Sequence, residues 1–338
     1  MASPPRPRIR DVAEVAGVSA TTVSHVLNGK GRVDEATRAR VIAAAERLGY
    51  RPNSTAKRLR SGRADTIGLL LPFGAAAEHA QHILAVEFYL TLAMSVVEAA
   101  FDHDQALLQL PPLRAPEDLR RFVVDGAIVV DPLPADPRLR LFDQLGLPTV
   151  TVGRDAARPA DPWWVATDST AGTRAVLDHL AAAGARRIAL LTVDIEWSWF
   201  VEGRRAYTAW THDHGIEPIT ILTRPDRLDS SAVEAATAAL DLEPDAVYAP
   251  PQWLATGLLK AAKERGVRVP DDLLVSVGVD SQLARTGEPP LTALDLAPVR
   301  TAREAVDLLV QRIEGRASGG SRLIPAELRP RRSSTPSG

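Results

Sequence analysis

The chain of 338 residues contains no cysteine. Disulfide bridges, thiolate metal ligands and a cysteine nucleophile are therefore excluded. Nowhere do about 18 apolar residues follow one another, so the sequence predicts no membrane-spanning helix and no membrane partner. The first ten residues, MASPPRPRIR, lack the apolar segment of a secretory signal, and we therefore expect a cytoplasmic protein.

The sequence motifs of common enzyme classes are also missing. No GxGxxG follows a predicted strand, and neither a Walker loop nor an HExxH string occurs. An enzyme on a Rossmann-like scaffold is therefore a disfavoured alternative, and we expect no cofactor and no bound metal. The hydrophobic share of 45% and the charged share of 24% are typical of a folded globular protein, whose length suits two or three domains.

Charge is distributed unevenly along the chain. Residues 1–63 contain 13 Lys and Arg against 5 Asp and Glu, whereas the remainder contains 27 basic and 37 acidic residues. A small basic head on a large acidic body favours contact between the head and a polyanion. A solvated basic face without a partner is the alternative interpretation.

The head region reads as a short tail, residues 1–8, followed by a small all-α domain over residues 9–52. Helix-capping residues and apolar spacing predict three helices there, at Asp11–Ala16, from the Ser19 cap to about Leu27, and between the Asp34 cap and Gly49. Residues 53–63 form a further short basic segment, in which Asn53 can cap one more helix.

Residues 64–328 alternate short apolar runs with amphipathic stretches. Strands are expected at 67–71, 106–110, 127–130, 149–152, 188–192, 219–222, 246–249 and 274–277, and helices at 84–101, 116–124, 169–183, 201–214, 231–240, 254–265 and 299–314. This rhythm predicts parallel sheets with helices on both faces, and its length predicts an α/β core of two lobes. Residues 329–338 are expected to be a disordered tail.

The first two helices form a helix-turn-helix pattern. They are joined by Gly17-Val18-Ser19, where glycine permits the tight turn and the valine can fill the space between the helices. The second helix begins with ATTVSH, whose small polar side chains can touch base edges and thymine methyl groups in a major groove. Val23, Val26 and Leu27 are expected to face inward. A three-helix bundle that binds nothing is the alternative, which the basic excess disfavours.

Residues Asp11–Arg63 closely resemble the N-terminal domain of the LacI/GalR family of bacterial transcription regulators. The strings VAEVAGVS and TVSHVLN, followed by LGYRPN, carry this resemblance. It implies that Ala20 and Thr21 read bases. It further implies DNA contacts from Ser19, Thr22, Ser24, His25, Asn28, Tyr50, Arg51 and Asn53. At the position that would cap the first helix, this chain departs from the family pattern, with Arg8 in place of Ser or Thr.

The family resemblance also gives a role to the segment Asn53–Arg60. In the family this segment becomes a hinge helix only on operator DNA, and Leu59 then enters the minor groove as an apolar wedge. The residues themselves agree, because Lys57 and Arg58 lie among further arginines over about two helical turns, where repulsion disfavours a free helix. Contact with phosphates would relieve that repulsion, so coupled folding and DNA binding is expected.

The body resembles the same family more weakly, through strings such as VTVGRD and GLLKAAKERGVRVPDDLLVSVGVD. The resemblance implies a core similar to periplasmic sugar-binding proteins, with two lobes, three crossing strands and a ligand cleft between them. Clefts between lobes and the carboxyl ends of parallel strands are common small-molecule sites.

Individual cleft positions follow from the resemblance. Asp280 matches an acidic residue that contacts effector hydroxyls, with a carboxylate satisfied by backbone N–H groups as the alternative. Phe88 and Tyr89 match an aromatic pair in the first lobe. Departures occur at Gly153, Phe200 and Pro251-Gln252, where sugar-binding members commonly have Asp, Arg and Asn-Asp.

Aromatic residues are scarce, yet six of the 16 map to the inferred cleft: Phe88, Tyr89, Trp197, Trp199, Phe200 and Trp253. Aromatic faces stack on the C–H faces of sugars or on flat ligands. Together with the lost polar groups, they predict an effector less polar than a free monosaccharide, such as a glycoside, an oligosaccharide or a flat metabolite. Asp280 and Gln252 would be its polar neighbours.

The sequence as a whole favours a homodimeric, effector-controlled transcriptional repressor. A near-palindromic operator is expected, because each head reads one half-site of double-stranded DNA. An effector-independent or architectural DNA-binding protein is the main alternative, which the large cleft-forming body disfavours.

Overall fold

The computed structural model describes residues 7–27, 31–50, 62–72, 87–113, 115–223, 228–316 and 320–335. The chain divides into two compact units, Met1–Ala64 and Asp65–Gly338. This division lies next to the boundary expected after residue 63. The expected hinge helix lies outside the described residues.

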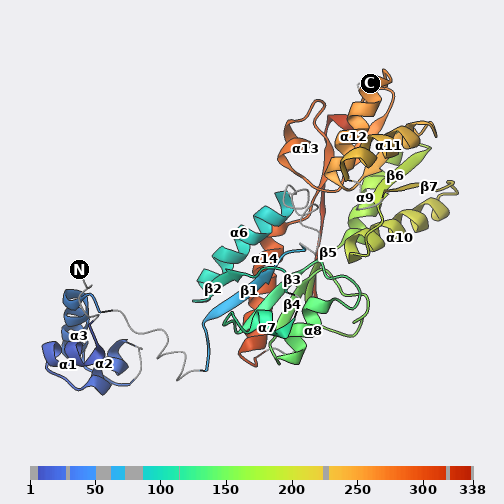
Figure 1. The fold of residues 1–338 in the computed structure, drawn as a ribbon. Coiled ribbons are helices and arrows are strands. Elements are labelled where there is room, and N and C mark those ends of the chain that lie inside the picture. Colours follow the sequence, from blue (N-terminus) through green and yellow to red (C-terminus); the bar gives the residue numbers. More distant parts are fainter. Residues whose placement is uncertain are drawn as a thin grey trace. The chain divides into compact units, whose positions relative to one another are not determined.

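The described part of the first unit contains three helices, α1 (Ile9–Ala16), α2 (Ala20–Leu27) and α3 (Glu35–Leu48) (Figure 1). Gly17 adopts the left-handed conformation that ends α1. Ser19 Oγ accepts a hydrogen bond from the Thr22 N–H at 3.1 Å, and Asp34 caps α3 in the same way through the Thr37 N–H at 2.9 Å. The local sequence rules therefore predicted this helix-turn-helix correctly.

The start of α1 compensates for its unusual cap. Arg8 has no side-chain acceptor, but its backbone N–H donates to the Asp11 carboxylate at 2.7 Å. This is one half of a capping box, and the acidic group also complements the helix dipole. Inside the unit, Val23 and Val26 are buried and Leu27 is half-buried against the same apolar core, which confirms the three predicted inward-facing positions. Val12 and Val41 are fully buried beside them.

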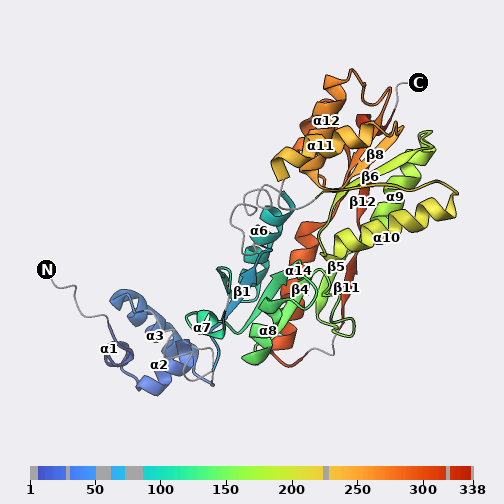
Figure 2. The same ribbon diagram turned by 45° about the vertical axis from the view of Figure 1, so that its right-hand side comes forward.

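The second unit contains two six-stranded sheets in its described part, one in each of two lobes (Figures 1 and 2). The sheet of lobe 1 has the order β11 (Arg322–Ile324), β5 (Trp164–Thr167), β4 (Thr149–Val152), β3 (Gly126–Val130), β1 (Thr66–Leu70) and β2 (Ala106–Gln109). The sheet of lobe 2 has the order β12 (Glu327–Arg329), β10 (Thr292–Asp295), β9 (Leu274–Val277), β8 (Ala246–Ala249), β6 (Ile188–Val193) and β7 (Ile219–Thr223). All neighbours are parallel except β10 and β12.

Helices cover both faces of each sheet. In lobe 1 they are α6 (Glu87–Asp102) and α14 (Pro298–Ile313) on one face, with α7 (Pro116–Leu119) and α8 (Pro137–Gln144) on the other. In lobe 2 they are α11 (Leu228–Leu240) and α12 (Gln252–Glu264) on one face, with α9 (Ser169–Ala182) and α10 (Ser198–Asp213) on the other; α13 (Gln282–Thr286) follows β9. No helix of the described residues is long and apolar enough to cross a membrane.

The chain passes between the lobes three times. It leaves lobe 1 after β5, returns between β10 and α14, and crosses again between β11 and β12. The two-lobed α/β architecture with parallel sheets and three crossings is therefore confirmed.

Several short elements escaped the sequence analysis: α8, β5, α13, β10, β11 and β12. The helix expected over 116–124 ends at Leu119, because the chain turns there to enter β3. The expectation of a disordered tail from residue 329 is wrong for residues 329–335. β12 pairs with β10, and Ser333 and Ser334 in the 3-10 helix η2 (Arg332–Ser334) are fully buried.

Candidate DNA-contact helix and ligand pocket

The described DNA-contact candidates lie on or beside α2. The side chains of Thr21 and His25 are exposed, and Ala20 and Ser24 are half-buried along the same helix. Ser19 and Thr22 share a hydrogen bond between their hydroxyl groups at 2.8 Å, which fixes both at the start of the helix. Six predicted contact residues lie outside the described residues: Asn28, Arg51, Asn53, Lys57, Arg58 and Leu59.

Tyr50 is the remaining candidate of the first unit. It packs against the apolar core of the three helices, and burial raises the pKa of its phenol. The phenol therefore stays protonated at neutral pH and keeps its hydrogen-bond donor.

A pocket lies between the two lobes of the second unit, at the carboxyl ends of their strands. Asp131 follows β3 and Gly153 follows β4 in lobe 1, while Val193 ends β6 and Pro250 and Gly278 follow β8 and β9 in lobe 2. All predicted effector residues except Asp280 line it: Phe88, Tyr89, Gly153, Trp197, Trp199, Phe200, Gln252 and Trp253. The open α/β topology explains this position, since both sheets present their strand ends to the same space.

Asp131 is the acidic group of this pocket. Its Oδ2 accepts a hydrogen bond from the Tyr89 hydroxyl at 2.5 Å, and the residue is buried. Burial raises the pKa of Asp131 to about 6, against the opposing effects of the Tyr89 hydrogen bond and the nearby Arg138 guanidinium. Arg138 itself donates to the carbonyl oxygens of Leu71, Val130 and Asp131, which holds this strand edge together.

Gly153 leaves room for this carboxylate. A Cβ atom at Gly153 would lie 2.9 Å from Asp131 Oδ1 and 3.4 Å from Ser198 Oγ, and the glycine has a φ of +91°. A larger residue at this position would therefore be strained and would displace Asp131. The acidic group that sequence comparison found missing at Gly153 is thus supplied by the neighbouring strand, at Asp131.

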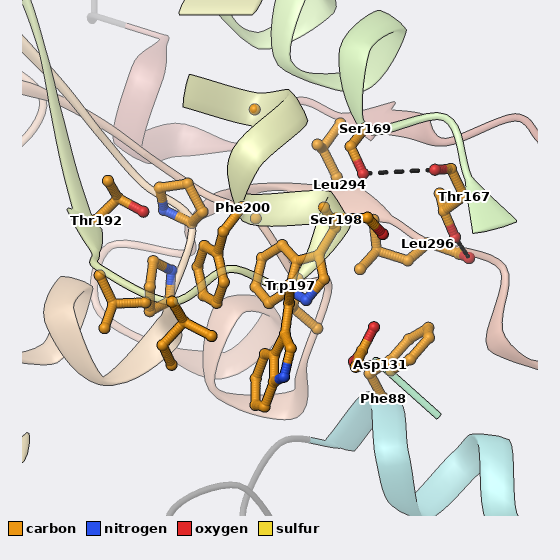
Figure 3. A pocket seen from close by; sticks show the side chains of 18 of the residues that line it. Phe88, Asp131, Thr167, Ser169, Thr192, Trp197, Ser198, Phe200, Leu294 and Leu296 are labelled. Carbon is orange, nitrogen blue, oxygen red and sulfur yellow. Dashed lines mark hydrogen bonds between the residues drawn. The ribbon is translucent and has the colours of Figure 1, made fainter. Parts of the chain in front are cut away.

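The wall from lobe 2 is aromatic (Figure 3). The ring of Phe200 stacks on Trp199 with 3.6 Å between centroids and lies 6.2 Å from the Trp197 ring. Opposite them, Phe88 meets the Tyr89 ring edge-on at 5.4 Å. In Figure 3, Asp131 and Phe88 lie together on one side of the pocket and face Trp197 of the other lobe.

Few polar groups in the described part of lobe 2 remain free for a ligand. Arg204 lines the pocket, but its guanidinium donates to the carbonyl oxygens of Val193 and Ile195. Gln252 Oε1 is buried without a hydrogen-bond partner among the described residues, so a ligand donor there would satisfy it. No group of three His, Asp or Glu in the described part of the chain could hold a metal ion.

Asp280 does not line the aromatic pocket. Its Oδ1 lies 2.8 Å from Arg331 and 3.7 Å from Arg285, and its backbone carbonyl accepts from Arg285 at 2.9 Å. The alternative of a carboxylate satisfied by backbone N–H groups is not what the structure shows, and Asp280 instead lines a second cavity that shares Phe88 with the aromatic pocket. An arginine from the segment expected to be a disordered tail occupies this carboxylate instead.

Sequence reasoning missed Asp131, because the family resemblance assigned the acidic role to Asp280. Asp131 directly follows the predicted strand 127–130, and Asp280 comes three residues after the predicted strand 274–277, so both were candidates for a strand-end carboxylate. The sequence does not show which strand end faces the other lobe.

Comparisons with known proteins agree on one family. A model of "Bacterial regulatory proteins, lacI family" matches residues 8–53, and a model of a periplasmic binding protein-like domain matches residues 177–334. The HTH-type transcriptional regulator CelR of Thermobifida fusca is 31% identical over 330 residues, covering 94% of this chain and 95% of its own.

Two solved structures are also similar. A CelR–cellobiose complex superposes with a TM-score of 0.70 at 28% identity, covering 97% of this chain and 100% of its own. A Lac repressor dimer bound to operator and an anti-inducer superposes with a TM-score of 0.80 at 24% identity, covering 98% and 99%. At 24% identity, the similarity to the Lac repressor shows a shared fold.

Proposed function

The chain belongs to the lacI family of bacterial regulatory proteins, as a DNA-binding transcriptional regulator and not an enzyme, and we propose that it is a repressor whose pocket binds a saccharide effector. The observation that carries this proposal is the pocket between the lobes, with one buried carboxylate at Asp131 and aromatic walls on both sides. Effector binding there changes the arrangement of the lobes and thereby the affinity for operator DNA.

The chemistry of the pocket favours a glycoside or an oligosaccharide. A carboxylate accepts hydrogen bonds from sugar hydroxyls, and aromatic rings stack on the apolar faces of pyranose rings. The relative CelR has been solved with cellobiose, which supports the same ligand class here. A flat metabolite is the second candidate, favoured by the stacked Trp199 and Phe200 and by the scarcity of free polar groups.

The DNA-binding part of the proposal rests on α2 and on the basic segment over residues 53–63. Ala20 and Thr21 would read base edges, while Ser19, Thr22, Ser24, His25, Asn28, Tyr50, Arg51, Asn53, Lys57 and Arg58 would hold the head on the duplex and Leu59 would enter the minor groove. Since operator DNA lies in the bacterial cytoplasm, the proposal places the protein there.

A homodimer completes the proposal, since one head reads one half-site. An apolar face of α6 is suited to this contact, because Leu90, Met94, Val97 and Phe101 recur at helical spacing and are 52%, 62%, 43% and 81% exposed. Sedimentation of Met94→Glu should give monomers at concentrations where the unchanged protein is dimeric. Val123→Glu, at a 63% exposed residue away from α6, is the matched control.

The decisive experiment combines footprinting with calorimetry. Genome-wide footprinting should show discrete near-palindromic sites, whereas diffuse coverage would indicate an architectural protein. Titration with cellobiose, other oligosaccharides, free hexoses and aromatic metabolites should then give one class that binds the unchanged protein and not Asp131→Ala. Binding of a ligand that leaves operator affinity unchanged would contradict the regulatory role of the pocket.

A further inference from the structure

An ion pair joins the two lobes beside the pocket residue Phe88, at a second cavity that Phe88 also lines. Glu87, the first residue of α6 in lobe 1, lies 2.6 Å from Arg285 of α13 in lobe 2. The second oxygen of Glu87 accepts a hydrogen bond from the backbone N–H of Gln282, at the start of the same lobe 2 helix. Burial alone would raise the pKa of Glu87, but Arg285 and the Gln282 N–H lower it, so the carboxylate is charged at neutral pH. We name this contact the α6 clasp.

A second ion pair joins the lobes at the α10 rim. Arg154, which follows β4 in lobe 1, lies 2.6 Å from Glu202 of α10 in lobe 2. The backbone N–H of Arg154 also donates to Ser198 Oγ at 3.0 Å, and its guanidinium lies over the Trp164 ring at 5.0 Å. The Glu202 side chain is only 16% exposed, so this contact, the α10 clasp, is less screened by water than the α6 clasp.

Each clasp is adjacent in sequence to residues that line the pocket. Glu87 precedes Phe88, Arg154 follows Gly153, and Glu202 precedes Gly203, which also lines the pocket. A ligand that moves these pocket residues must therefore move the charged groups beside them. Other ion pairs, such as Arg265 with Asp241 at 2.7 Å, lie within one lobe and have no such position.

From this arrangement we infer that the two clasps hold the lobes in the arrangement that forms the effector pocket, and that they couple its occupation to the relative position of the lobes. The inference rests on the proposed effector-controlled function and adds the residues through which that control acts. Glu87, Arg285, Arg154 and Glu202 are positioning residues, since they act through the lobes and not through contact with the effector. Removing a clasp lowers the population of the binding arrangement and weakens effector binding by the same factor.

The first test measures the distance between the lobes without any ligand. Because the chain has no cysteine, Arg140→Cys in lobe 1 and Glu264→Cys in lobe 2 accept two spin labels specifically. Both positions are exposed, and dilution with unlabelled protein keeps one labelled chain per dimer. The unchanged clasps should give one narrow distance distribution by pulsed electron paramagnetic resonance. Glu87→Gln and Glu202→Gln should each add a second population, and the double variant should enlarge it.

The second test measures effector affinity with cellobiose as the probe. Glu87→Gln and Arg285→Gln should each weaken binding by about two- to fivefold, which is the range of a partly exposed ion pair. The double variant should bind no more weakly than Arg285→Gln alone, because Arg285→Gln already removes the ion pair with Glu87 together with the hydrogen bond to the Asp280 carbonyl. Asp241→Asn breaks the ion pair with Arg265 inside lobe 2 and is the control, which should leave both the distances and the affinity unchanged.

The outcomes separate the clasps from the effector proposal. If cellobiose and the other saccharides fail to bind the unchanged protein, the proposal of a saccharide effector is wrong. The distances measured without ligand still test the role of the clasps. Distance distributions of Glu87→Gln and Glu202→Gln that equal that of the unchanged protein would overturn the inference. It would also be overturned if Asp241→Asn changed the distances as much as those two variants do.

Discussion

The hydroxyl of Tyr89 and the carboxylate of Asp131 meet at 2.5 Å, although the two residues are 42 positions apart in the chain. Tyr89 belongs to the first turn of α6 and Asp131 follows β3, so the hydrogen bond ties the helix to the sheet edge at the pocket. Burial raises the pKa of Tyr89 well above its ordinary value, and therefore the phenol remains the donor throughout the accessible pH range. The other oxygen of Asp131, Oδ1, lies beside Gly153, and both residues line the pocket.

Effector binding should depend on the protonation of Asp131. The pKa of Asp131 is raised to about 6 by burial, so acidification from pH 7.5 to pH 5 converts an acceptor of sugar hydroxyls into the neutral acid. A hydrogen bond to a charged group contributes about 1.5–3 kcal/mol, and about a tenth of the carboxyl groups is still ionised at pH 5, so the affinity should fall by about five- to tenfold. Calorimetry over this pH range measures the effect. Asp131→Asn should bind weakly with no such pH dependence, and an equal pH dependence in that variant would contradict the assignment.

The raised pKa of Asp131 should also make the protein less stable as the pH rises. A salt-bridged acid, whose pKa is lowered, has the opposite effect. The pKa of Asp131 is about 6 in the folded protein and 3.8 in the unfolded chain, so the folded state binds more protons between these values. The free energy of unfolding should therefore fall as pH rises from 4 to 6, relative to Asp131→Asn. The full difference, at pH 7, is on the order of 3 kcal/mol. Urea unfolding of both proteins at several pH values measures it, and a constant difference would refute the raised pKa.

Operator binding should depend strongly on salt. Arg51, Lys57, Arg58 and Arg60 lie beside phosphates in the proposed complex, and each neutralised phosphate contributes roughly 0.9 to the slope of log affinity against log salt. Fluorescence anisotropy between low and physiological salt measures this slope. Lys57→Gln should reduce it by about one unit per head, while a nearly flat slope in the unchanged protein would contradict the DNA-binding role of the segment.

Base preference and DNA bending should respond to different residues. Replacement of Ala20 and Thr21 should change the preferred bases, at about 1–3 kcal/mol for each well-formed interaction with a base that is removed. Leu59→Ala should weaken operator binding much more than non-specific binding, because only a kinked site needs the apolar wedge. Binding to operator and to random duplex is compared for each variant. Equal weakening of both by Leu59→Ala would show that the wedge role is wrong.

The C-terminal segment should contribute to stability. Ser333 Oγ donates to the Val275 carbonyl at 2.6 Å and accepts from the Thr292 N–H at 2.9 Å, while Ser334 lies 2.7 Å from His179. A chain that ends at Arg331 leaves these buried groups without partners, which should lower the free energy of unfolding by about 2–4 kcal/mol. Urea unfolding measures the loss. A chain that ends at Thr335 should match the full-length protein, and an unchanged stability in the shorter chain would contradict the packing role.

Local rules predicted the head because its helix ends depend on near neighbours. Gly17, Ser19 and Asp34 act within four residues of the groups they cap, and each does so in the structure. The longer helices and central strands of the core were predicted for the same reason, since their apolar spacing is contained in the segment itself. β5, β11 and β12 are short strands whose existence depends on partners far along the chain, and no local pattern marks them.

The pocket was predicted less completely than the fold. Its aromatic residues could be found because the family resemblance assigned them to the cleft and the structure places them there. The acidic group of the pocket could not be identified from the sequence, because the choice between Asp131 and Asp280 depends on Arg331. That arginine reaches Asp280 only after the last strand has joined the sheet of lobe 2. The sequence also does not show that a carboxylate is still present beside Gly153, because Asp131, which supplies it, follows a different strand.

The three passages between the lobes set the order in which the protein can become complete during synthesis. The first unit needs nothing beyond Ala64, whereas the edge strands of both sheets, β11 and β12, lie within the last 17 residues. Domains fold as their residues leave the ribosome. The DNA-reading head therefore folds early on the nascent chain, and neither lobe of the sensor can complete its sheet until β11 and β12 have been synthesised. A chain that stops before Arg322 would have the DNA-reading head without a complete sensor.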